Sequence, residues 1–409
     1  MLIIFKMLAV LLVIVILLKR KYPFGNAMLV ASLVLFLITN PFFSNLSLSL
    51  QKTISNPGTW VMITTLYFVM CLEYMLRTSG LLKDFTASAR KIFRSDRVLL
   101  GFMPAFLGFL PSLGGAIFSA PLVKEAGARY KLSAEKLTAL NYWFRHVWEY
   151  CNPIIPAILL GSELTGTPLS SLIGNQFIFT IAAIVIGSLI LLTGKSYRID
   201  DVSKTPKQLE TTGQISTRAA IRGTFLAAGP ILLNILLVAL FDFNPVLSLG
   251  LVLSGMAVIL KFNFAKLKKM FTSAIDLPMF WAVLNIFFFQ QILENTGTTK
   301  QIVEVLGSSG IPTIAIIGLT SFIIGILVGS PQGFVAVSFP LAVALAPGNL
   351  DVIAVAYLAG ISGTISSPAH LCLIVTLEYF KADFLKSLTY IAIAQGILLL
   401  FGLSYIFLF

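Results

Sequence analysis

The stretch "GSPQGFVAVSFP" (Gly329–Pro340) places a Ser-Pro-Gln-Gly break inside a long apolar run. A second stretch, "LPSLGGAIFSAP" (Leu110–Pro121), places a Pro-Ser-Leu-Gly-Gly break in another such run about 219 residues earlier. Both runs, 98–128 and 311–345, are longer than the roughly 20 residues that cross a bilayer as one helix. We therefore expect each run to form a re-entrant hairpin, whose non-helical tip is buried in protein or lines a cavity.

The composition is that of a membrane protein. The 409 residues are 57% hydrophobic and only 11% charged, whereas a soluble domain has about a quarter of its residues charged. We attribute the net charge of +12 to basic loops between spans and expect no nucleic-acid binding. No Walker A motif is present, so direct use of ATP is not expected. The three cysteines lie in or beside apolar segments and are interpreted as buried thiols without a disulfide framework.

The two halves of the chain resemble each other. Offsets of 219 and 215 residues align equivalent positions in the same order along the chain, which indicates an internal duplication. Each half holds five expected spans and one hairpin, and because five is odd the second copy enters the membrane from the opposite face. The matched residues include Gly114 with Gly333, Tyr142 with Tyr357, Pro153 with Pro368 and Glu163 with Glu378.

The predicted fold is an all-α polytopic membrane protein of 10 spans and two hairpins, arranged as two inverted-topology repeats. The first repeat covers 1–193, a polar cytoplasmic linker covers 194–218, and the second repeat covers 219–409. Within them, scaffold spans lie in 1–76 and 219–293, hairpins in 98–128 and 311–345, and broken spans in 137–160 and 352–377.

The basic residues predict the orientation. With this span count, 25 of the 29 lysines and arginines fall on one side of the membrane, which we assign to the cytoplasm. Both termini are then extracytoplasmic. Hairpin 98–128 opens toward the cytoplasm, and hairpin 311–345 opens toward the outside.

The broken spans contain "YCNPIIP" (Tyr150–Pro156) and "SGTISSPAH" (Ser362–His370). A proline removes a backbone donor and displaces the carbonyl four residues earlier. Exposed N–H groups at half-helix N-termini suit anions, and unwound carbonyls suit Na⁺. We expect the four breaks to meet near the bilayer midplane as a binding site; the alternative is that each is a simple proline kink.

Candidate site residues lie at these breaks. Arg145 would bind a substrate carboxylate through paired hydrogen bonds, although an internal pair with Glu149 or a snorkelling side chain is an alternative. The hydroxyl and amide groups would bind substrate oxygens or cap half-helices. The substrate-binding candidates are Ser112, Gly114, Arg145, Asn152, Ser330, Gln332, Gly333, Thr364 and Ser367. The candidates for cation or proton coupling are His146, Glu149, Ser362, Ser366 and His370.

We expect no metal site and no catalytic residues. His146, Glu149 and His370 are not accompanied by an HExxH pattern or by a run of clustered histidines and cysteines. Motifs of membrane-embedded enzymes are also missing from the sequence, and the two hairpins present no obvious pore-lining series for a channel.

The whole-chain plan resembles the ion transporter superfamily, which includes citrate and dicarboxylate/sodium symporters, gluconate-type permeases and arsenite carriers. The features that carry the resemblance are the hairpin tips "LPSLGG" and "GSPQG", each followed by a broken span, "EYCNPIIP" and "SGTISSPAH". The tips differ from the Ser-Asn-Thr motif of dicarboxylate/sodium symporters, which places the chain in a separate branch. The resemblance implies a homodimer with a fixed scaffold domain and a transport domain that moves by an elevator mechanism.

The sequence thus predicts a secondary active transporter in the cell membrane. Its substrate would be a small organic anion, a carboxylate or a sugar acid, taken with Na⁺ or H⁺ and without a cofactor. The alternative is a cation/proton antiporter of the same architecture, in which Glu149 or His146 carries the proton.

Overall fold

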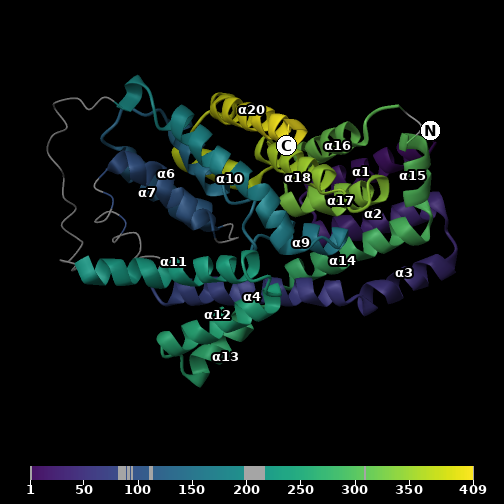
Figure 1. Ribbon diagram of the computed structural model, residues 1–409, viewed down its shortest axis with the longest axis horizontal. Coiled ribbons are helices and arrows are strands. Elements are labelled where there is room, and N and C mark those ends of the chain that lie inside the picture. The colour runs from purple at the N-terminus through teal and green to yellow at the C-terminus, as the bar shows by residue number, and fades with distance from the viewer. Residues whose placement is uncertain are drawn as a thin grey trace.

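The computed structural model describes residues 2–81, 89, 93, 95–109, 114–197, 217–307 and 310–408. These residues form helices and no β-strand, which confirms the all-α prediction (Figure 1). α20 lies along the upper edge of the view in Figure 1, and α12 and α13 form its lower edge. Among the described residues, five helices are long and apolar enough to cross a membrane: Leu2–Lys19, Pro57–Thr78, Leu169–Leu191, Leu277–Asn295 and Phe384–Leu408.

The two halves of the chain run through similar series of helices. The first series is α1 (Leu2–Lys19), α2 (Phe24–Thr39), α3 (Phe43–Ser55), α4 (Pro57–Thr78), α6 (Asp96–Gly108), α7 (Gly114–Gly127), α8 (Ala134–His146), α9 (Pro156–Thr165) and α10 (Leu169–Leu191). The second series is α11 (Thr217–Ala239), α12 (Pro245–Ile259), α13 (Phe264–Ser273), α14 (Leu277–Asn295), α15 (Thr298–Gly307), α16 (Thr313–Val328), α17 (Pro331–Leu345), α18 (Leu350–Ile365), α19 (Leu371–Phe380) and α20 (Phe384–Leu408).

Short helices between the spans were not expected from the sequence. α3 lies between α2 and α4, α13 lies in the similar place between α12 and α14, and α15 follows α14. Each has 10 to 13 residues, too few to cross a bilayer. α13 contains three lysines, so part of the basic charge that we attribute to loops between spans lies on a helix.

Helix pairs stand where the hairpins were predicted. α16 packs against α17, and α6 packs against α7. The turn between α16 and α17 is tight because Gly329 ends α16 in the left-handed conformation (φ 65°) and Pro331 begins α17. A Cβ on Gly329 would lie 2.9 Å from the Ala369 carbonyl carbon, so the turn rests directly on the second broken helix. The tip of the first hairpin, residues 110–113, lies outside the described part of the chain.

Both predicted broken spans are interrupted, over ranges that overlap the predicted ones but differ from them at one end. α8 already ends at His146, so the first break starts before Tyr150. α18 continues to Ile365, so Ser362 and Thr364 are helical and not part of the second break. A proline disrupts the helix in its own neighbourhood. The sequence pattern does not show how many residues before the proline the helix ends.

Glycines allow the hairpins to contact the broken helices backbone to backbone. A Cβ on Gly108 of α6 would lie 2.1 Å from the Arg145 carbonyl oxygen on α8. A Cβ on Gly325 of α16 would lie 2.4 Å from the Gly360 carbonyl oxygen on α18. Small residues permit such close helix packing in membranes. The hairpins therefore pack tightly against the elements that carry the breaks.

Contacts between the two halves occur in matching couples. α2 packs on α14, and α12 packs on α4. In the same way α9 packs on α17 and α19 on α7, while α8 packs on α20 and α18 on α10. Within each couple the two contacts are equivalent: α12 is the second-series counterpart of α2, and α14 is the counterpart of α4, so the contact of α2 with α14 matches that of α12 with α4.

Candidate functional site

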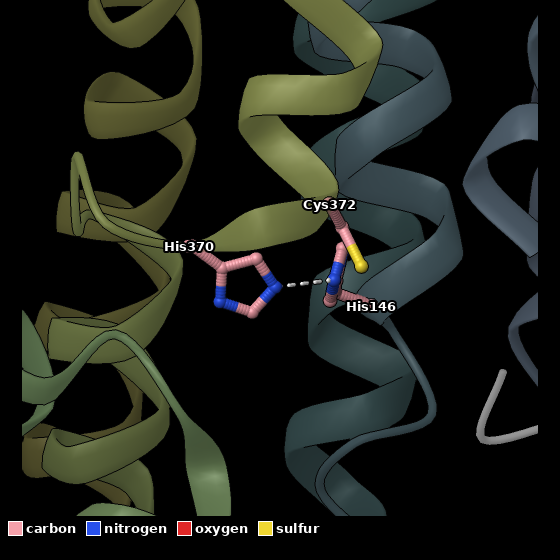
Figure 2. Close-up of side chains that lie close together, drawn as sticks. All are labelled: His146, His370 and Cys372. Carbon is pink, nitrogen blue, oxygen red and sulfur yellow. Dashed lines mark hydrogen bonds between the residues drawn. The ribbon is translucent and has the colours of Figure 1, made fainter. Parts of the chain in front are cut away.

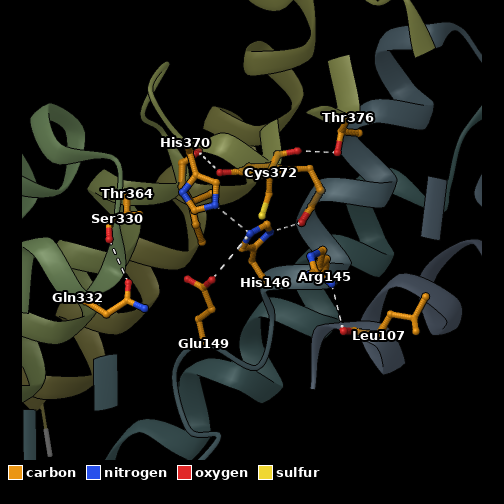
Figure 3. Close-up of polar contacts among 12 residues, drawn as sticks. Leu107, Arg145, His146, Glu149, Ser330, Gln332, Thr364, His370, Cys372 and Thr376 are labelled. Carbon is orange, nitrogen blue, oxygen red and sulfur yellow. Dashed lines mark hydrogen bonds and ion pairs between the residues drawn. The ribbon is translucent and has the colours of Figure 1, made fainter. Parts of the chain in front are cut away.

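The two helix breaks meet at a pair of histidines. His146 is the last residue of α8, and His370 caps the N-terminus of α19, which packs against α8. Their Nε2 atoms are 3.1 Å apart, and both side chains are buried (Figure 3). Residues 224 positions apart in the sequence therefore form one polar centre.

Two buried tyrosines bind carbonyls that the breaks leave without helical partners. The Tyr142 hydroxyl on α8 donates to the Ile365 carbonyl at 3.0 Å, at the end of α18. The Tyr357 hydroxyl on α18 donates to the Glu149 carbonyl at 2.9 Å, in the break after α8. An unsatisfied backbone carbonyl is costly at membrane depth. Each tyrosine thus stabilises the break in the opposite half of the chain.

The residues that precede the two break prolines make equivalent contacts. Asn152 Nδ2 donates to the Phe109 carbonyl at 2.9 Å, and Ser367 Oγ donates to the Ile326 carbonyl at 2.6 Å. Each side chain also accepts from the backbone N–H two residues further along, at 3.2 and 3.1 Å. Both candidates therefore hold their break in shape and tie it to the first helix of a hairpin.

Arg145 and Glu149 lie beside the histidines. The Arg145 side chain is 6% exposed, and its Nη1 donates to the Leu107 carbonyl of α6 at 3.1 Å. Glu149 Oε1 is 3.7 Å from His146 Nε2, and the Glu149 side chain is 14% exposed. The carboxylate thus contacts His146, while the guanidinium contacts the hairpin (Figure 3).

The tip of the second hairpin lies apart from Arg145. Ser330 Oγ donates to Gln332 Oε1 at 3.0 Å, and Gly333 is buried on the first turn of α17. Figure 3 shows Ser330 and Gln332 on one side of the histidine pair and Arg145 on the other. The structure does not gather all the substrate-binding candidates around the guanidinium.

Most of the remaining candidates form hydrogen bonds near their own helix, and Ser112 lies outside the residues that the structure describes. Ser362 Oγ donates to the Leu358 carbonyl at 2.6 Å and accepts from Gln395 Nε2 at 2.6 Å. Thr364 Oγ1 donates to the Gly360 carbonyl at 2.9 Å, and Ser366 is the C-cap of α18. Gly114 is the first residue of α7, and Ser112 lies outside the described residues.

Sequence reasoning did not include Cys372 in the site. Its Sγ and one ring nitrogen from each of His146 and His370 all lie within 4.8 Å of one another (Figure 2). The available signal was that Cys372 follows His370 by two residues, so two residue types that commonly bind metals lie close together in the sequence. We had treated the thiol only as a buried apolar group.

Comparison with known proteins gives the family and the fold. The chain belongs to the family described as "Protein of unknown function (DUF401)", whose model matches residues 2–408. A sequence search finds no match among curated proteins. The chain is structurally similar to the YdaH transporter of Alcanivorax borkumensis, with a TM-score of 0.62 at 15% identity, over 89% of this chain and 86% of that one. This likeness and the apolar helices make the chain a multi-pass membrane protein with the fold of a membrane transporter.

Proposed function

We propose that this protein is a secondary active transporter of a small organic anion, coupled to Na⁺ or H⁺, in the cytoplasmic membrane. The observation that carries the proposal is the meeting of His146 and His370, 3.1 Å apart, at the breaks of two helices from opposite halves of the chain. Unwound backbone at membrane depth is tolerated where it is buried in protein or lines a cavity, and it is typical of transporter substrate sites.

An inverted repeat is part of the proposal. It is supported by the matching helix contacts between the two halves: α2 packs on α14 just as its counterpart α12 packs on α4. It is supported further by the tyrosine contacts, because Tyr142 and Tyr357 are 215 residues apart and each binds the break of the other half. Matching contacts of this kind are expected when two copies of one module are related by a two-fold axis in the membrane plane.

The same contacts support a division into two bodies. The hairpins and broken helices pack on one another, as in the contacts of α16 with α18 and of α17 with α9. The helices assigned to the scaffold contact each other in the pairs α1–α2, α2–α14, α4–α12 and α11–α12. We propose that the first group moves as an elevator against the second, that the protein is a homodimer, and that both termini are extracytoplasmic.

The anion would bind near Arg145, whose buried guanidinium lies beside the two breaks and donates to the Leu107 carbonyl. Charge-assisted, bidentate binding by a guanidinium suits a carboxylate. Coupling would involve His146, Glu149 and His370, with the carbonyls around Ser362 and Ser366. The amide and hydroxyl groups of Asn152 and Ser367 would shape the pocket while they hold the breaks.

The test is ligand binding by purified protein, followed by uptake into proteoliposomes. A screen of carboxylates and sugar acids in Na⁺ and in K⁺ should reveal a ligand that raises the melting temperature, because a ligand at 100 times its Kd stabilises the folded state by about 2.7 kcal/mol. Arg145→Gln should abolish binding and uptake. Arg129→Gln is the matched control, because Arg129 pairs with Asp96 and its side chain is 50% exposed. Normal uptake by Arg145→Gln would remove the anion-site assignment.

A cation/proton antiporter is the second candidate. The observation in its favour is the contact between Glu149 and His146, two proton-carrying groups in one buried cluster. Its signature would be Na⁺ flux driven by a pH gradient in the absence of any organic substrate, and loss of that flux in Glu149→Gln.

A further inference from the structure

Three side chains that commonly bind metals converge where the two broken helices cross. His146 comes from the end of α8, while His370 and Cys372 come from the start of α19. The two imidazole rings are nearly perpendicular (interplanar angle 77°), and Figure 2 shows the Cys372 sulfur beside His146. We propose that His146, His370 and Cys372 bind a Zn²⁺-class divalent metal ion, a site that replaces our sequence-based expectation of none.

The tautomer of His146 leaves a lone pair directed at the centre of this cluster. His146 Nδ1 is 2.5 Å from the Tyr142 carbonyl oxygen, which can only accept, so Nδ1 carries the proton. Nε2 is then unprotonated and faces His370. A histidine that binds a metal through one nitrogen usually donates the other N–H to a carbonyl or carboxylate. The Tyr142 carbonyl is such an orienting group.

A neutral His370 carries one ring proton. That proton cannot both form a hydrogen bond to the His146 lone pair and provide a hydrogen bond for Nδ1. The Nδ1 of His370 has no hydrogen-bond partner among the described residues. A proton on His370 Nε2 makes one bond to His146 and leaves Nδ1 bare and buried, whereas a proton on Nδ1 leaves two lone pairs 3.1 Å apart. A cation between the two Nε2 atoms removes this repulsion and lets His370 keep its proton on Nδ1.

The distances fit a small tetrahedral ion. With Zn–N bonds of about 2.0–2.1 Å, two nitrogen ligands lie about 3.3 Å apart, close to the observed 3.1 Å. With a Zn–S bond of about 2.3 Å, sulfur and nitrogen ligands lie about 3.6 Å apart, and the observed donor atoms are all within 4.8 Å of one another. Ligation therefore requires only small side-chain movements.

Glu149 lies beside this cluster and would supply the fourth ligand after a movement of its side chain. Its Oε1 is 3.7 Å from His146 Nε2, and its Oε2 has no hydrogen-bond partner among the described residues. A metal ion deprotonates a coordinating thiol, so Cys372 and Glu149 together would neutralise the two positive charges of the ion. The imidazole and thiolate donors select Zn²⁺ over Mg²⁺ or Ca²⁺, which prefer oxygen ligands.

The test is Co²⁺ and Zn²⁺ binding by the purified full chain, carrying an affinity tag that contains no histidine. Co²⁺ should bind once per chain with a thiolate charge-transfer band and tetrahedral visible bands, and Zn²⁺ should displace it. Cys372→Ser should lose the charge-transfer band, and His370→Gln should weaken binding at least about 100-fold, since loss of an orienting group alone costs about 10–100-fold. Cys71→Ser is the matched control, because Cys71 is a buried thiol on α4, outside the breaks.

Three results would overturn the site: no Co²⁺ binding, Co²⁺ binding without a thiolate band, or affinities of Cys372→Ser and His370→Gln within threefold of the parent. Gel-filtration profiles of the variants establish that they are folded before binding is compared. The result is independent of the proposed substrate, because it needs no transport assay. Failure of metal binding would leave the proposed anion site untouched, and absence of anion uptake would leave the metal site untouched. Metal binding by His146, His370 and Glu149 would, however, exclude these groups from proton coupling and assign coupling to Na⁺ or to other groups.

Discussion

Tyr142 and Tyr357 each donate a hydrogen bond to the broken helix of the other half of the chain, to the carbonyls of Ile365 and Glu149. The two tyrosines are 0% and 2% exposed. Because each carbonyl lies where regular helix has ended, the hydroxyl replaces a hydrogen bond that the backbone cannot make. The polar centre is therefore held from both halves by similar means.

Removing either hydroxyl should destabilise the protein. In Tyr142→Phe or Tyr357→Phe the carbonyl partner stays buried and unpaired, which costs about 1–3 kcal/mol. We expect a lower melting temperature in detergent for each variant. Tyr379→Phe is the control, since Tyr379 is 37% exposed and its ring contact with Lys124 survives the change. Equal melting temperatures for all three variants would show that these hydroxyls do not stabilise the breaks.

Adding a methyl group at the hairpin contacts should be more disruptive than its size suggests. In Gly108→Ala and Gly325→Ala the new Cβ would meet a backbone oxygen at 2.1 and 2.4 Å, which side-chain movement cannot relieve. Overpacking of this kind costs about 1–3 kcal/mol. The free energy of unfolding measures the effect. Gly255→Ala and Gly396→Ala have no atom within 4 Å of the new methyl and should be neutral or slightly stabilising.

The proposed inverted repeat predicts opposite accessibility for the open ends of the hairpins. After replacement of the native cysteines, a thiol in Lys131→Cys should react with a membrane-impermeant reagent only from the cytoplasmic side. A thiol in Pro347→Cys should react only from outside. Both positions are exposed, so access to water is not limited by the fold. Labelling of both positions from the same side would exclude the repeat.

Coupling should depend on Glu149. If this carboxylate carries the proton, uptake by Glu149→Gln should no longer respond to an imposed pH gradient, because the amide cannot exchange a proton at neutral pH. Glu163→Gln, a change of a second partly buried carboxylate on α9, should keep the response. The measurement is uptake into proteoliposomes with and without the pH gradient, compared between Glu149→Gln and Glu163→Gln. A normal pH response in Glu149→Gln would assign coupling to Na⁺ or to another group.

The sequence predicted the helical class and the positions of the helix pairs because these depend on local features. Apolar length and a Pro/Gly break were sufficient to expect α16 and α17 on either side of Gly329. The end of α8 at His146 could not be predicted, because it depends on the Tyr357 hydroxyl and on the contact with α6.

The inclusion of Cys372 depends on how α8 crosses α19, a relationship between segments more than 200 residues apart. Figure 3 shows the histidine pair between Arg145 and the tip of the second hairpin, an arrangement that the sequence pattern does not specify. Sequence patterns identify which residues leave regular structure. They do not give the direction in which a side chain then points.

At the offset of 215, the ionisable residues of the first break fall on residues without charge in the second. Arg145, His146 and Glu149 correspond to Gly360, Ile361 and Thr364. The charged and proton-carrying groups aligned in this way therefore come from the first half of the chain, while the second half contributes His370 and Cys372. A substrate bound in the proposed site would therefore have more ionisable groups on one side than on the other. If the two halves form the proposed inverted repeat, we expect its affinity to differ between the inward-open and the outward-open states, although the backbones of the halves are alike.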